Sequence, residues 1–211
     1  MEPIWLKQYP AEVPKNINAE LYPSLKDLLE TAFKKYADKP AYQMMGKSVS
    51  FAEVDEASRA LAAYLQGLGL EKGDRVAIMM PNLLQYPIAM FGALRAGLIV
   101  VNTNPLYTVR EMRHQFNDAG ARVLVIVDMF ADKLAEVIPK VKVERVVLAG
   151  VSEMFPSIPN LVVRGVQKVW SKVLPPIPAL PQTIERLGAA LTAGRAAGGR
   201  EKVASYWQGI P

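Results

Sequence analysis

The chain has 211 residues, and its hydrophobic share of 51% excludes disorder along the whole length. It contains no cysteine, which excludes disulfides, thiolate metal sites and a cysteine nucleophile. The net charge of +5 arises entirely in residues 164–211, which hold seven basic residues against two acidic ones. Such a basic tail favours an anionic partner, although a solvated basic surface explains it equally well.

In chain order, helical spacing of apolar residues predicts a first helix over residues 24–36, with Ser24 as its N-cap. A second helix is expected over residues 54–65, ending at Gly67. Short apolar strands and helices then alternate. Strands are expected at 76–80, 98–101, 123–127 and 145–149, and helices at 83–95, 109–118 and 130–138. Wholly apolar strands separated by helices predict an α/β fold, with a parallel sheet flanked by helices.

The texture changes after Gly150, because residues 151–181 hold six prolines and a continued sheet is not expected there. Between these prolines, residues 161–174 have the pattern of a basic amphipathic helix, with Arg164, Lys168 and Lys172 on one face and Trp170 at its border. Such a helix suits an anionic membrane surface. A helix packed on its own protein is the commoner alternative. Residues from 191 onward are rich in Ala, Gly and Arg and are interpreted as a linker.

We therefore divide the chain into a helical and extended arm (1–48), an α/β subdomain (49–150) and a Pro-rich segment with a linker-like tail (151–211). The first residues lack a basic segment followed by an apolar one, so no secretory signal is predicted. The longest nearly apolar run, residues 88–101, is interrupted by Arg95 and is shorter than the ~20 residues that a membrane span needs. We expect a cytoplasmic protein, soluble or peripheral at the inner membrane.

Two features that suggest chemistry are weak. The glycine pattern from Gly67 to Gly73 follows a helix, whereas a dinucleotide-binding fingerprint follows a strand. His114 is the only histidine, and no Gly-x-Ser-x-Gly motif supplies a nucleophile for it. We expect His114 to lie partly buried on a helix surface, and we predict neither a metal site nor a catalytic residue.

Stronger candidates lie where the predicted strands end, because ligands of open parallel sheets bind beyond the carboxyl ends of the strands. The polar or aromatic residues at these positions are Asn82, Asn102, Thr103, Asn104, Pro105, Tyr107 and Asp128. One interpretation is a substrate pocket or a subdomain interface formed around residues 102–107. The other is local turn chemistry, in which Asn and Thr cap the helix that starts near Val109. The residues alone leave both open.

Several motifs, in the right order, resemble the adenylate-forming (acyl-CoA synthetase) superfamily. The segments VSFAEV (49–54) and GLEKGDRVAI (69–78), followed by Pro81-Asn82, are similar to its first core block, and LRAGLIVVNTNPLYT (94–108) is similar to its second. The spelling NTNPLYT followed by REMRHQFNDAG resembles bacterial long-chain fatty-acid–CoA ligases, and Trp5, Tyr9 and the segment 21–25 fit that branch. Aryl and peptide-synthetase adenylation domains share the two blocks and are a weaker alternative.

The resemblance implies an incomplete, N-terminal subdomain of an enzyme that uses ATP, Mg²⁺ and CoA to convert a long-chain fatty acid to an acyl-adenylate and then a thioester. The family's Gly/Thr-rich phosphate loop and later catalytic positions do not occur in the 211 residues, and residues 200–211 do not align with the family. We therefore expect this chain alone to be inactive, to bind no cofactor tightly and to self-associate through an exposed apolar face. The alternative is a stand-alone membrane-surface or protein-interaction module that uses the basic helix. No nucleic-acid partner is expected.

Overall fold

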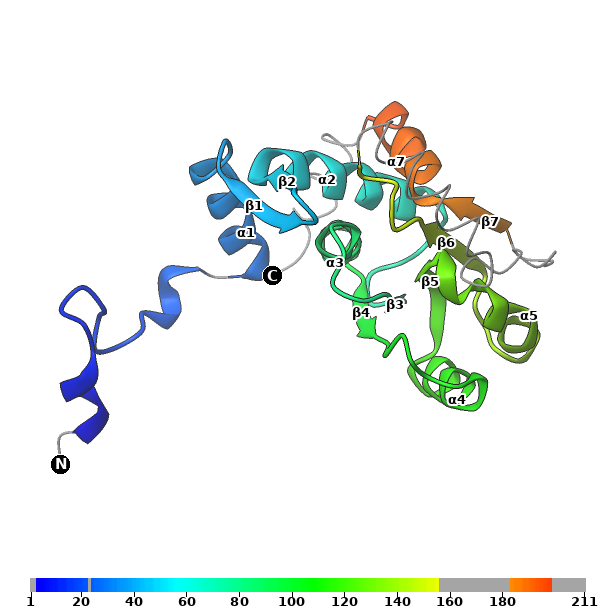
Figure 1. The fold of residues 1–211 in the computed structure, drawn as a ribbon, viewed down its shortest axis with the longest axis horizontal. Helices are drawn as coiled ribbons and strands as arrows, with labels where there is room; N and C mark the ends of the chain where they lie inside the picture. The colour runs from blue at the N-terminus through cyan, green and yellow to red at the C-terminus, as the bar shows by residue number, and fades with distance from the viewer. Residues whose placement is uncertain (1–2, 23, 156–182, 199–211) are drawn as a thin grey trace.

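The computed structural model describes residues 3–22, 24–155 and 183–198 (Figure 1). Its body is a five-stranded, wholly parallel sheet of order β4-β3-β5-β6-β7. The strands are β3 (Arg75–Met79), β4 (Ile99–Asn102), β5 (Ala121–Val127), β6 (Arg145–Ala149) and β7 (Thr183–Arg186). The expected α/β fold is confirmed. The predicted basic helix with Arg164, Lys168, Trp170 and Lys172 lies outside the described residues.

Helices cover both faces of the sheet, as the apolar strands predict (Figure 1). One face carries α2 (Phe51–Gly67), α3 (Gln85–Arg95) and α7 (Leu187–Ala196), and the other carries α4 (Val109–Ala119) and α5 (Leu134–Val137). Successive residues of a strand point to opposite faces of the sheet. Val76 and Ile78 of β3 pack in the core beneath α2, α3 and α7, and Ala77 and Met79 pack in the core beneath α4 and α5. A sheet that is buried on both faces requires strands without polar positions, and β5 meets this requirement along nearly its whole length.

The helix starts follow from short-range polar contacts. Ser24 caps α1 (Leu25–Lys35) by accepting a hydrogen bond from the backbone amide of Asp27, as predicted. A capping box of Ser50 and Glu53 begins α2 three residues earlier than the apolar spacing suggests. Gly67 is the last residue of α2, and the left-handed turn falls on Gly69 (φ 76°). The glycine with the left-handed conformation that follows the helix therefore lies two residues later than predicted.

A hairpin that the sequence analysis did not predict connects α1 to α2. Strands β1 (Pro40–Met44) and β2 (Lys47–Ser50) are antiparallel, and Met45 and Gly46 between them both have positive φ. Next to the hairpin, Phe33 of α1 packs edge-to-face on Phe91 of α3, with ring centroids 5.6 Å apart. Residues 24–50 thus pack on the body, whereas residues 3–22 extend away from it (Figure 1).

The sheet resumes after the prolines of residues 151–181, and the linker interpretation is wrong for residues 191–196, which belong to α7. Strand β7 pairs in parallel with β6, and α7 then packs along α2. Leu187 and Ala190 of α7 are fully buried. Gly194 comes so close to α2 that a Cβ there would lie 1.8 Å from the carbonyl oxygen of Ala60. A composition that resembles a linker is therefore a set of small residues that permits close helix packing.

The helix expected over residues 130–138 is present only in part, because the segment is broken into short helical pieces. A 3₁₀ turn, η3 (Asp128–Lys133), contains the non-helical Phe130 (φ −111°), and α5 is followed by a second 3₁₀ turn, η4 (Ile138–Lys140). Pro139 in η4 limits α-helix continuation because it has no amide hydrogen to donate. Across the described ranges, no helix is long and apolar enough to cross a membrane.

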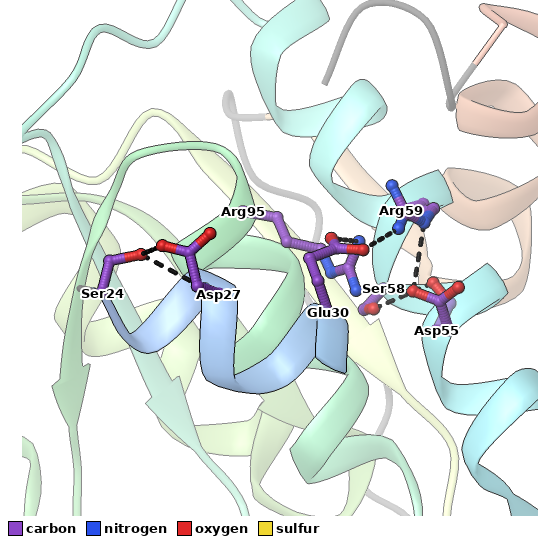
Figure 2. Close-up of polar contacts among 7 residues, drawn as sticks. All are labelled: Ser24, Asp27, Glu30, Asp55, Ser58, Arg59 and Arg95. Carbon is purple, nitrogen blue, oxygen red and sulfur yellow. Dashed lines mark hydrogen bonds and ion pairs between the residues drawn. The ribbon is translucent and has the colours of Figure 1, made fainter. Parts of the chain in front are cut away.

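Arg95, which interrupts the longest apolar run, is buried at the junction of three helices (Figure 2). From α3 it reaches Glu30 of α1 at 2.9 Å and Asp55 of α2 at 2.5 Å. Arg59 pairs with the same two carboxylates, and the Arg95 guanidinium also lies over the ring of Phe33. Burial lowers the pKa of Arg95, and the two carboxylates oppose that shift. The cluster joins α1 to the body.

Candidate functional site

The strand order creates a switch point at β3. The chain passes from β3 to β4 on one side through α3, and then returns past β3 to β5 through α4 on the opposite face. Loops that leave neighbouring strands toward opposite faces open a crevice at their carboxyl ends, where ligands of such sheets bind. Asn82 follows β3 here and is exposed, while Asp128 directly follows β5 and is nearly buried.

The loop after β4, residues 102–108, is fixed by contacts to three helical elements. The Tyr86 hydroxyl of α3 donates to the Asn102 Oδ1 at 2.8 Å, and Gln115 of α4 donates to the Asn102 carbonyl at 3.0 Å. At the other end, the Lys133 ammonium of η3 donates to the Tyr107 carbonyl at 2.7 Å. The loop is therefore held in one position at the edge of the sheet.

Within this loop, the candidate residues have different environments. The Thr103 amide donates to the Ile78 carbonyl and extends the strand pairing, and its side chain is buried. Asn104 is exposed, and its Oδ1 accepts from the Leu106 amide in a local turn. Pro105 and Tyr107 are half-buried. The cap of α4 is Thr108, in a capping box with Glu111, so Asn102 and Asn104 do not cap it.

Three further polar side chains at this edge were missed by the sequence analysis. The Gln85 amide, fully buried in α3, donates to the Gly150 carbonyl at 2.6 Å. The Glu153 carboxylate accepts from the Gly150 amide at 3.0 Å and from the Gly188 amide, in the first turn of α7, at 2.9 Å. Arg186 at the end of β7 donates to Asp128 at 2.8 Å.

Apart from the contact between Gly150 and Glu153, these contacts connect residues 35 to 65 positions apart in the chain, so no local pattern could have indicated them. Only Asp128 had a signal, because it directly follows an apolar strand. Both carboxylates at this edge, Asp128 and Glu153, accept hydrogen bonds that hold loops together. The contacts at this edge therefore serve to position its loops.

Residues that could hold a metal do not gather in the described part of the chain: it contains no cluster of three His, Asp or Glu side chains with suitable geometry. His114 is exposed on α4, more so than expected, beside Arg110 and Asp118 and away from the loop after β4. Acid–base chemistry centred on this histidine therefore has no structural support.

The AMP-binding enzyme family matches residues 29–187, which is most of the chain. The protein belongs to this family. It is 52% identical over 176 residues to a long-chain-fatty-acid–CoA ligase of Escherichia coli O6:H1, an alignment that covers 83% of this chain and 31% of that relative. It is 35% identical over 164 residues to the enzyme of the same name from Bacillus subtilis. The chain thus corresponds to an N-terminal portion and spans about a third of the length of these relatives.

Solved structures of the family agree with this assignment. A long-chain-fatty-acid-CoA ligase from Archaeoglobus fulgidus superposes with a TM-score of 0.55 at 27% identity, covering 65% of this chain and 30% of that one. A 4-coumarate–CoA ligase of Pinus taeda, an aryl-type member, matches only 104 residues at 35% identity. Among these curated relatives, the longer and more identical alignments are to the long-chain-fatty-acid–CoA ligases.

Proposed function

We propose that this chain forms the N-terminal α/β subdomain of a long-chain fatty-acid–CoA ligase. Such an enzyme uses ATP and Mg²⁺ to convert a fatty-acid carboxylate to an acyl-adenylate, and then transfers the acyl group to the thiol of CoA. The observation that carries the proposal is the 52% identity to long-chain-fatty-acid–CoA ligases across 83% of the chain. The parallel sheet, with polar loops fixed at its carboxyl edge, supports it.

In this proposal the carboxyl edge forms a wall on which the catalytic parts of the ligase assemble. Asn102, held by Tyr86 on one side and Gln115 on the other, presents a rigid loop for this purpose. Asp128 and Arg186 hold the neighbouring loops together. Acyl-adenylate formation requires groups that stabilise the developing phosphate charge, and the hydrogen bonds that Tyr86, Gln115 and Arg186 donate at this edge all go to other groups of the chain. The chain by itself is therefore inactive.

Pyrophosphate release tests this proposal. The purified 211-residue chain is incubated with ATP, Mg²⁺ and palmitate, and the Escherichia coli ligase is assayed in parallel as the positive control. The proposal predicts palmitate-dependent release from the ligase and none from the chain. Palmitate-dependent release by the chain alone, in a preparation free of host ligase, would show that it carries its own catalytic groups.

Self-association of the chain is part of the same proposal. Strand β4 forms an edge of the sheet; Ile99 in this strand is half exposed, and Leu106 in the following loop is 77% exposed. An unpaired edge with apolar side chains is a surface that other chains can cover. Light scattering during size-exclusion chromatography should show a mass that rises with protein concentration, and Ile99→Lys should reduce it. A concentration-independent monomer would contradict this.

A further inference from the structure

An apolar cavity lies at the opposite, amino edge of the sheet, between α1 and the end of α3. Its volume is about 230 Å³, and its walls are leucine side chains. These are Leu25, Leu29, Leu94 and Leu98. The volume exceeds the ~150 Å³ of an apolar cavity that is able to bind benzene. Leu25 is 53% exposed, so the cavity opens to solvent beside it and a ligand can enter.

Two short turns form the other side of this cavity. Lys72 lies in the turn before β3, and Gly97 lies in the turn before β4. The Gly73 amide donates to the Gly97 carbonyl at 3.0 Å, which joins the two turns. Because these turns precede the strands, the cavity lies at the end of the sheet opposite Asn102 and Asp128. It is a separate location from the carboxyl edge.

The charges around the cavity are predominantly positive. Lys26 and Lys72 line it, and Lys72 is exposed, so its ammonium group lies on the solvent side. The remaining charged lining residues, Glu30 and Arg95, pair with each other (Figure 2). The cavity thus combines apolar walls with a cationic rim.

We propose that this cavity binds a single-chain amphiphile with an anionic head group, such as a fatty acid. The tail packs against the four leucines, and the head group lies between Lys26 and Lys72. Scaled from the ~150 Å³ cavity that holds the six carbons of benzene, a cavity of about 230 Å³ holds about nine carbon groups, which is the tail length of decanoate. A cationic head is repelled at the same rim. This inference goes beyond the proposed ligase function and does not depend on it.

Isothermal titration calorimetry of the 211-residue chain with decanoate, below its micelle concentration, tests the proposal. Decanoate should bind at one site. Octanoate has two fewer methylenes and should bind roughly fifteenfold more weakly, because each buried methylene is worth about fourfold in affinity. Decyltrimethylammonium has a tail of similar length and a cationic head. Its affinity should be at least about fivefold lower than that of decanoate. Undetectable decanoate binding, or equal affinity for the two head groups, would overturn the proposal.

Variants then locate the site. Leu25→Trp fills the mouth of the cavity and should abolish decanoate binding, and Lys72→Glu should weaken it about fivefold. Both positions are exposed, so circular dichroism should show an unchanged fold. Lys142→Glu makes the same charge change at an exposed position outside the cavity and should have no effect. Undiminished binding by Leu25→Trp would place the amphiphile elsewhere and refute the proposal.

Discussion

Gly194→Ala tests whether α7 packs on α2 in solution as the structure has it. A Cβ at this position would lie 1.8 Å from the Ala60 carbonyl oxygen and 2.6 Å from its carbon. Real Cβ contacts shorter than 3.0 Å are essentially absent, so α7 must move outward by more than about 1 Å. The obstacle is backbone of α2, and a side-chain rotation cannot relieve it.

The expected cost follows from this displacement. Overpacking of a buried contact costs about 1–3 kcal/mol, and complete undocking of α7 would expose Leu187, whose burial is worth about 2–3 kcal/mol. Replacing Gly by Ala within a helix raises the free energy of unfolding by up to about 1 kcal/mol, because Ala has the higher helix propensity. We therefore expect Gly194→Ala to lower the free energy of unfolding by about 1–2 kcal/mol, or roughly 3–6 °C in Tm.

Urea unfolding followed by far-UV circular dichroism measures this change. Gly67→Ala is the matched control, because Gly67 ends a helix, has no atom within 4 Å of a built Cβ and has no positive φ. It should be neutral or stabilising by about 0.5 kcal/mol. If Gly194→Ala behaves like this control, α7 does not pack closely on α2, and the linker interpretation of residues 191–196 is restored.

Three further predictions concern the helix junction and the helix caps. Arg95→Met removes a buried guanidinium from Glu30 and Asp55 and should cost about 2–4 kcal/mol in urea unfolding; an unchanged midpoint would contradict the buried cluster. Ser50→Ala removes the N-cap of α2 and should cost about 1 kcal/mol by the same measurement, whereas a loss below about 0.3 kcal/mol would argue against the capping box. The Ser50 amide, as hydrogen-bond donor, holds the pKa of Glu53 below its usual range, so this contribution is present above the unfolded pKa of about 4.3 and is lost as pH falls. Glu53→Gln should therefore be less stable than the wild type at pH 7 and equally stable near about pH 3; a constant difference at both pH values would refute this.

The sequence predicted those parts of the fold that depend on neighbouring residues. Ser24 was placed correctly at the start of α1, because capping involves contacts three residues away. Four strands of the sheet were located because burial on both faces requires continuous apolar runs. The hairpin of β1 and β2 was missed because its strands are short and only partly buried, and because its turn begins with Met45, which is unusual at positive φ.

The parts that were missed depend on contacts distant in sequence. The small residues of α7 allow close packing against Ala60 of α2, which lies more than a hundred positions earlier in the chain. Gln85 and Arg186 find their partners at the carboxyl edge only once the sheet has formed. Arg95 was noticed as an interruption of an apolar run, but its two carboxylate partners come from different helices. Asn102 was a correct candidate for the sheet edge, whereas the contacts with Tyr86 and Gln115 could not be foreseen.

The most direct test of the proposed function is a chimera in which residues 1–198 of this chain replace the aligned N-terminal portion of the Escherichia coli ligase. The 52% identity and the shared fold predict that this chimera forms palmitoyl-CoA from palmitate, ATP and CoA. The rate should lie within about tenfold of the parent enzyme, a difference of ~1.4 kcal/mol in the activation barrier. A chimera that is folded and binds ATP like the parent, but forms no palmitoyl-CoA, would contradict the proposal that this chain is the N-terminal subdomain of such a ligase.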